Sequence, residues 1–133
     1  MVKLIIGKKG FGKTKILIDR INEAAASSKG NVICVEKEPK LTYDLAKEVR
    51  LVHTDDYDIE GYAAFYGFLT GLLASNYDIT HIFVDSTLKI CGADYDALET
   101  FMDKINDASK DVLITFTISA APDELASSMQ KYV

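Results

Sequence analysis

Short apolar runs alternate along the chain with longer segments in which apolar residues recur every three or four positions. Residues 2–6 and 31–35 are almost continuously apolar and rich in β-branched residues, which predicts strands buried on both faces of a sheet. Between them, residues 14–26 place their apolar side chains on one side of a helical wheel, which predicts an amphipathic helix. The chain is therefore expected to begin as strand, helix, strand.

The same alternation continues to the C-terminus. We expect, in order, a short helix at 41–48, a strand at 49–54, a helix at 59–75, a strand at 80–85, a helix at 94–106, a strand at 111–119 and a final helix at 123–131. Helices between successive strands imply crossover connections, which join parallel strands. The predicted fold class is α/β, a three-layer sandwich with a five-stranded, mainly parallel sheet, and residues 1–133 are expected to form a single domain.

The helix at 59–75 is the most apolar of the predicted helices. Its longest apolar stretch, residues 62–74, is too short to span a bilayer. Gly67 and Gly71 lie four residues apart within it, a spacing that predicts close packing against another helix.

Composition and charge narrow the class of protein. A length of 133 residues fits one domain, and a hydrophobic fraction of 48% is too high for a disordered chain. Two cysteines are too few for a disulfide scaffold. The formal net charge of −5 argues against binding duplex DNA or an anionic membrane through bulk charge. Because no signal peptide precedes the first strand, we expect a cytoplasmic protein that binds neither a membrane nor nucleic acid.

The first predicted strand is followed by a specific motif. Residues 7–14, Gly-Lys-Lys-Gly-Phe-Gly-Lys-Thr, match G-x-x-x-x-G-K-[ST] at every fixed position. Glycines allow the backbone to curl so that its N–H groups converge on phosphate oxygens, and the following helix directs its positive end at the same anion. The sequence therefore predicts a phosphate-binding loop (P-loop) and a nucleotide-binding domain.

The motif indicates which groups are expected to bind ATP and Mg²⁺. Lys13 can reach the β- and γ-phosphates of ATP, and the Thr14 hydroxyl can ligate Mg²⁺. A second metal ligand is expected at Asp85, because this carboxylate ends an apolar strand in the manner of a Walker B element. Contacts to the nucleotide are expected along the whole loop, from Gly7, Lys8, Lys9, Gly10, Phe11, Gly12, Lys13, Thr14 and Lys15.

The order of these motifs resembles the RecA-like P-loop ATPases over roughly residues 2–119. The phosphate loop is followed by a strand that leads into Glu36 and Glu38, and later by an apolar strand that ends in Asp85. The resemblance implies a RecA-like core, ATP and Mg²⁺ as cofactors, and catalytic roles for Lys13 and for Glu38, which would orient the attacking water. Glu36 is the alternative for that carboxylate. Where the family has a polar γ-phosphate sensor, this chain has Ser119.

Two departures from that family bear on activity. Asp85 is followed by Ser86 and not by the usual catalytic glutamate, and the chain has only two arginines, Arg20 and Arg50. Arg20 is poorly placed to act on its own site, so that a finger supplied in trans would have to be Arg50 or a lysine. The segments that bind DNA in recombinases are also missing. We therefore expect a homo-oligomer or a protein partner to complete the site.

The sequence leaves several functions open. The first is a slow ATPase that binds Mg-ATP, and the second is a regulatory binding module that uses ATP without hydrolysing it. A fragment of a secretion or pilus motor ATPase and a small kinase are more remote alternatives, because the arginine-rich boxes or lid that they use are absent. A GTPase is disfavoured, since the chain has no Asn-Lys-x-Asp motif.

Overall fold

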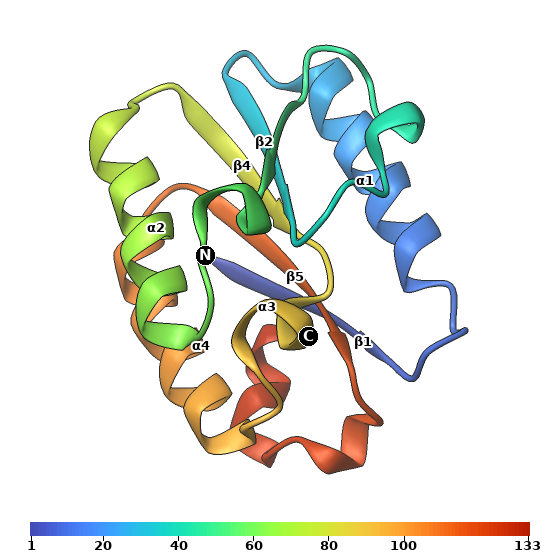
Figure 1. Ribbon diagram of the computed structural model, residues 1–133, viewed down its shortest axis with the longest axis vertical. Coiled ribbons are helices and arrows are strands. Elements are labelled where there is room, and N and C mark those ends of the chain that lie inside the picture. The colour runs from blue at the N-terminus through green and yellow to red at the C-terminus, as the bar shows by residue number, and fades with distance from the viewer.

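The computed structural model describes all 133 residues and contains one sheet of five strands. The strands are β1 (Val2–Gly7), β2 (Asn31–Glu36), β3 (Arg50–His53), β4 (Ile79–Val84) and β5 (Leu113–Ser119). Their order across the sheet is β1-β5-β4-β2-β3, and all four pairings are parallel (Figure 1). The sheet predicted as mainly parallel is thus parallel throughout.

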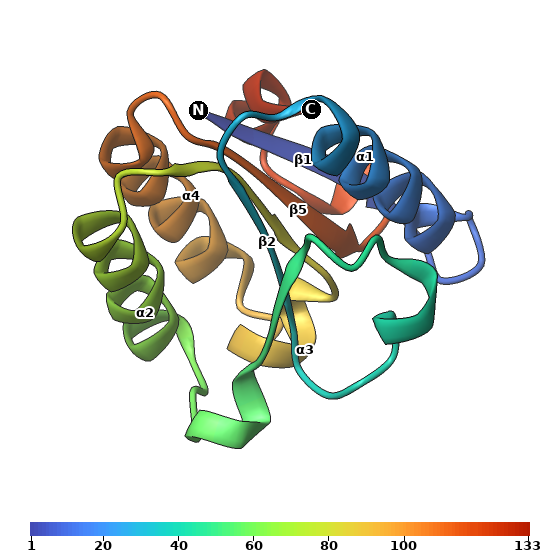
Figure 2. The same ribbon diagram turned by 90° about the horizontal axis from the view of Figure 1, so that it is seen from above.

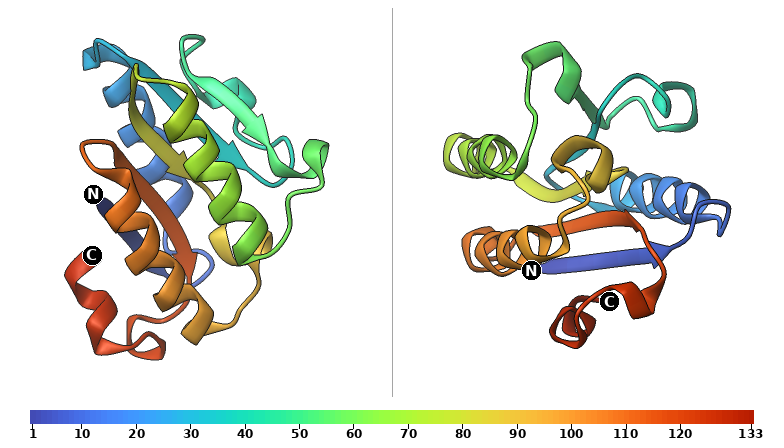
Figure 3. Two further views of the ribbon diagram at one scale, coloured as in Figure 1. Left: turned by 90° about the vertical axis from the view of Figure 1, so that its left-hand side faces the viewer. Right: turned by 60° about the horizontal axis from the view of Figure 1, so that its bottom comes forward.

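Helices cover both faces of the sheet (Figure 2). Helix α1 (Lys13–Ser27) lies on one face, and α2 (Tyr62–Ser75), α3 (Thr87–Cys91) and α4 (Tyr95–Ser109) lie on the other. The C-terminal segment passes beside β1 and packs with the helices opposite α1 (Figure 3). This arrangement is the predicted three-layer sandwich. None of the helices is both long enough and apolar enough to cross a membrane.

Each face of the sheet has its own hydrophobic core. Neighbouring residues of a strand point to opposite faces, so that Val35 belongs to the core under α2 and α4 and Cys34 to the core under α1. The first core contains 21 buried residues and the second contains eight. The strands therefore read as continuous apolar runs because they are covered on both faces.

The predicted helix at 41–48 is wrong. Only a single 3-10 turn, Thr42–Asp44, forms there. The Asn22 side chain on α1 donates to the carbonyl oxygen of Asp44 (2.9 Å) and accepts the backbone N–H of Ala46 (2.8 Å). These tertiary hydrogen bonds satisfy the backbone groups that an α-helix would have paired locally.

The predicted final helix at 123–131 is also wrong in type. Two 3-10 segments, Pro122–Glu124 and Ser127–Tyr132, are separated by Leu125, which is extended, and Ala126. Leu125 is buried in the larger core, and reaching that core interrupts the helical path. The five-residue helix α3 was not predicted, because a helix of this length carries too little periodicity to detect.

The parallel arrangement brings distant residues to one edge of the sheet. Gly7, Glu36 and Ser119 end their strands at the carboxyl edge, and Asp85 directly follows β4 there. Ligand sites of open α/β sheets lie outside this edge. Arg50 begins β3 and therefore lies at the opposite edge.

Candidate functional site

The connection from β1 to α1 has a backbone conformation that requires glycine. Gly10 and Gly12 have φ angles of +94° and +80°, in the left-handed region that L side chains rarely adopt. The backbone N–H of Phe11 donates to the carbonyl oxygen of Lys8 (3.1 Å), and that of Ile16 donates to Gly12 (3.2 Å). The loop thus curls directly into the first turn of α1, whose N-terminal N–H groups remain available to an anion.

Lys13 folds back across this loop. Its Nζ donates a hydrogen bond to the Lys8 carbonyl oxygen at 3.1 Å. The pKa of Lys13 is lowered, mainly by desolvation, while Asp85 acts to raise it and Lys40 adds to the lowering. Both of those groups are therefore close enough to act on the Lys13 ammonium.

The other predicted loop residues differ in what they offer a ligand. Lys8 and Lys9 are exposed and form no ion pair. Phe11 is 71% exposed, an unusual position for a large apolar side chain. Lys15 pairs with Asp19 on the outer surface of α1 (3.3 Å). For Lys15, the backbone N–H is the group that remains for phosphate.

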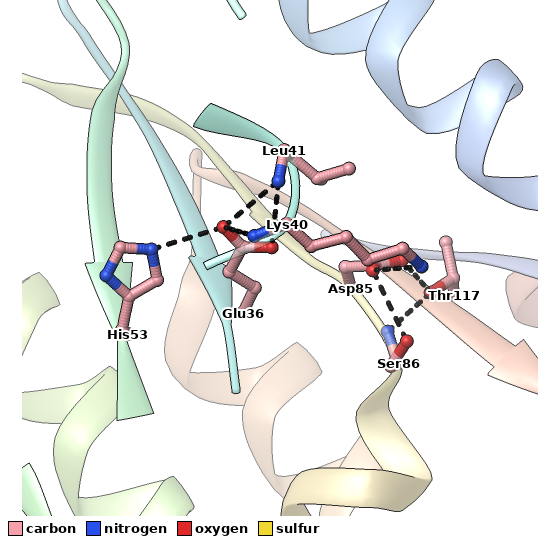
Figure 4. Close-up of polar contacts among 7 residues, drawn as sticks. All are labelled: Glu36, Lys40, Leu41, His53, Asp85, Ser86 and Thr117. Carbon is pink, nitrogen blue, oxygen red and sulfur yellow. Dashed lines mark hydrogen bonds and ion pairs between the residues drawn. The ribbon is translucent and has the colours of Figure 1, made fainter. Parts of the chain in front are cut away.

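Asp85 is a buried carboxylate whose orientation is fixed. The residue is 3% exposed, and its Oδ1 accepts a hydrogen bond from the Thr117 hydroxyl at 3.0 Å. Thr117 is oriented in turn by the backbone N–H of Ser86 (2.7 Å), and the Ser86 hydroxyl donates to Asp85 Oδ2 (3.3 Å). Figure 4 shows these three residues together with Lys40, whose Nζ lies 3.8 Å from Asp85 Oδ2. Asp85 therefore already faces a cation.

The residues present fit Mg²⁺. Asp85 offers a buried carboxylate oxygen, and Thr14 offers a hydroxyl in the first turn of α1. Mg²⁺ prefers such hard oxygen ligands and is held by one or two protein groups together with phosphates and water. The chain has no cluster of three or more His, Cys, Asp or Glu side chains, which is the pattern of metals bound by protein alone.

The structure gives the two candidate glutamates different environments. Glu36 is 2% exposed, and its carboxylate accepts the backbone N–H groups of Lys40 and Leu41, each at 3.3 Å. His53 Nε2 lies 3.2 Å from the same carboxylate (Figure 4). Glu38 is exposed and makes no side-chain hydrogen bond or ion pair. Glu36 thus anchors the loop after β2, and Glu38 is the carboxylate that remains unengaged.

Two polar residues of this site were missed by sequence reasoning. Thr117 gives a weak signal, because a buried hydroxyl within an apolar strand needs a partner. Lys40 gives none, since a lysine in a charged loop is usually solvated. Ser119, at the position of the family's sensor, is exposed and aligned with Gly7 of the neighbouring strand.

Comparison with known proteins shows which fold this chain shares. No protein-family model and no curated protein sequence matches this chain. The crystal structure of the flagellar accessory protein FlaH from Methanocaldococcus jannaschii is similar, with a TM-score of 0.61 and 15% sequence identity. The match covers 98% of this chain and 65% of FlaH, so the chain spans somewhat less than two thirds of that protein. This likeness confirms the predicted α/β fold with a RecA-like core, and at this identity it shows the fold alone.

Proposed function

We propose that the chain binds Mg-ATP through its β1–α1 loop and hydrolyses it slowly, in a site completed by a second copy or by another protein. The observation that carries the proposal is the convergence of a motif-matching phosphate loop, the Lys13 ammonium and the oriented Asp85 carboxylate at one sheet edge. A RecA-like fold supports it, because this edge is where such folds bind ligands.

Each residue has a definite task in this proposal. The backbone N–H groups of the loop and of the first turn of α1 bind the phosphates, and Lys13 exchanges its bond to Lys8 for phosphate oxygens. Thr14 and Asp85 would hold Mg²⁺. When bound, Mg²⁺ would neutralise charge on the β- and γ-phosphates.

Slow turnover follows from how the remaining groups are placed. Glu38 is our candidate to orient water, but no contact fixes its carboxylate. Ser86 follows Asp85 where a catalytic glutamate is common. Arg20 is exposed on α1, and Arg50 lies at the far edge of the sheet. A transition-state cation therefore has to come from elsewhere.

The same unanchored Glu38 favours a second candidate function. A carboxylate held by nothing is a poor general base, because catalysis needs a positioned group. In this alternative the chain is a regulatory module that binds ATP, orders a surface for a partner and releases the nucleotide unchanged.

A stability and turnover experiment tests the proposal. We expect Mg-ATP to raise the melting temperature of the wild type, since a ligand that binds only the folded state stabilises it. Lys13→Ala should abolish that shift, whereas the matched control Lys15→Ala should retain it, because Lys15 only pairs with Asp19 on the surface. An unchanged shift in Lys13→Ala would refute phosphate binding by this loop.

Turnover separates the two candidate functions. If the chain is an ATPase, wild type hydrolyses Mg-ATP above background and Glu38→Gln does so more slowly, with the thermal shift preserved in both. Stabilisation without turnover in either protein would select the binding module.

A further inference from the structure

The loop after β2 carries a lysine whose side chain reaches across to Asp85 (Figure 4). Lys40 Nζ lies 3.8 Å from Asp85 Oδ2, and Lys40 is among the groups that lower the Lys13 pKa. Lys40 thus pairs with the buried carboxylate, and the charges of both groups act on the Lys13 ammonium. The two positive charges of Lys13 and Lys40 exceed the single negative charge of Asp85. The site therefore keeps a net positive charge, which attracts a further anion.

The backbone of Lys40 is fixed while its side chain is not. The buried Glu36 carboxylate accepts the backbone N–H groups of Lys40 and Leu41, and Leu41 is only 1% exposed. His53 holds the same carboxylate from the other side. The Lys40 side chain is 54% exposed and has only the one long contact, at 3.8 Å. The ammonium can therefore change partners without moving the loop.

The Lys40 ammonium lies beside Asp85 Oδ2, where the proposed Mg²⁺ would bind. Asp85 and Thr14 would hold the metal, and a cation there would repel the Lys40 ammonium and favour its release from Asp85 Oδ2. In the bound state the terminal phosphate of the nucleotide would offer the Lys40 ammonium another anionic partner. Neither arginine can serve it within one chain, because Arg20 lies exposed on α1 and Arg50 at the opposite sheet edge.

We propose that Lys40 senses the terminal phosphate: it pairs with Asp85 when the site is empty and with the γ-phosphate when Mg-ATP is bound. This inference rests on the proposed function and adds a residue that distinguishes a nucleoside triphosphate from a diphosphate. A diphosphate lacks the group with which Lys40 pairs, so Lys40 contributes little to its binding.

Titration calorimetry with two ligands tests the proposal. We expect Lys40→Met to weaken binding of Mg²⁺ with a non-hydrolysable ATP analogue about tenfold, the loss of one charge-assisted hydrogen bond, and to change MgADP binding less than about threefold. Lys47→Met is the matched control, because Lys47 is an exposed lysine of the same connection that forms no ion pair. Lys47→Met should bind both ligands like the wild type, and Lys40→Arg should retain the preference for the triphosphate.

Glu36→Gln provides a second variant that leaves Lys40 in place. The substitution weakens the hydrogen bonds by which Glu36 holds the backbone of Lys40 and Leu41. It should therefore reduce the preference for the triphosphate, as Lys40→Met does. Equal losses for both ligands in Lys40→Met, or no loss for either, would overturn the role of Lys40 while leaving nucleotide binding intact. A wild type that binds neither ligand would instead refute the proposed function, and the inference with it.

Discussion

At the scale of single residues, the site depends on how firmly Asp85 is held. A carboxylate binds a cation well when its orientation is fixed before the cation arrives, because no reorganisation is then needed. The Thr117 hydroxyl supplies this restraint from the neighbouring strand, donating to Asp85 while accepting the Ser86 N–H. In the proposed magnesium site, Thr117 would therefore act on the metal through Asp85.

Replacing that hydroxyl should affect the metal more than the nucleotide. We expect Thr117→Val to weaken Mg²⁺-dependent ADP binding about tenfold, the usual cost of losing a group that orients a metal ligand. ADP binding without Mg²⁺ should stay within about twofold of the wild type, because the loop itself is unchanged. Calorimetry with and without Mg²⁺ measures both constants.

Thr115→Val is the control for this substitution. Thr115 lies two residues earlier on β5, points to the same face and is as buried as Thr117, but its hydroxyl does not bond to Asp85. An equal loss of Mg²⁺ dependence in both variants would show that packing of the strand, and not the hydroxyl bond, is responsible.

At the scale of elements, α2 contains two glycines that nothing in this chain requires. The spacing of Gly67 and Gly71 predicted close packing against another helix. A Cβ added at either position meets no atom within 4 Å, so the prediction is wrong within this chain. Glycine inside a helix costs stability relative to alanine, because it loses more backbone freedom on folding.

Alanine at these positions should stabilise the protein. We expect Gly67→Ala and Gly71→Ala each to raise the free energy of unfolding by about 0.5–1 kcal/mol, measured by urea denaturation. Gly12→Ala is the contrasting variant: the space around Gly12 is also open, but its φ of +80° strains any L side chain, so this change should destabilise. A loss of stability in the α2 variants would contradict the open environment of these glycines.

The elements also show what the sequence could and could not predict. Strands such as β4 were predicted from their continuous apolar runs, and helices such as α4 from the periodicity that marks their buried face. The segment 41–48 failed because Asn22, on another helix, supplies its hydrogen bonds. Pairing across such a distance leaves no local pattern.

The same difference between local patterns and long-range contacts applies to the candidate site. The candidate phosphate loop could be recognised because its motif is continuous in sequence from Gly7 to Thr14, and phosphate binding by it stays a prediction. The contacts that tune it join residues far apart: Thr117 to Asp85, and Lys40 to Asp85. The predicted fold brings these strand ends to one edge but does not say which side chains meet there.

At the scale of the whole molecule, neither arginine of the chain is placed to stabilise the transition state in its own site. Arg50 is exposed and lies at the edge of the sheet opposite the phosphate loop. It is therefore remote from the site of its own chain. If copies associate head to tail, the edge that carries Arg50 in one copy faces the carboxyl edge of the next, and Arg50 can then reach the site of that copy. The exposed Phe11 at the loop supplies apolar surface that such a contact would cover.

A head-to-tail association makes turnover depend on protein concentration. We expect ATP hydrolysis per chain to rise with concentration, with a matching rise in mass by light scattering in the presence of a non-hydrolysable ATP analogue. Arg50→Ala should lose this rise but bind nucleotide normally, because arginine supplied across an interface acts on the transition state. Arg20→Ala should keep it, since Arg20 is exposed on α1 and has no part in the proposed contact. Constant turnover per chain from a particle that stays monomeric would contradict completion by a second copy, and a different protein would then have to supply the cation.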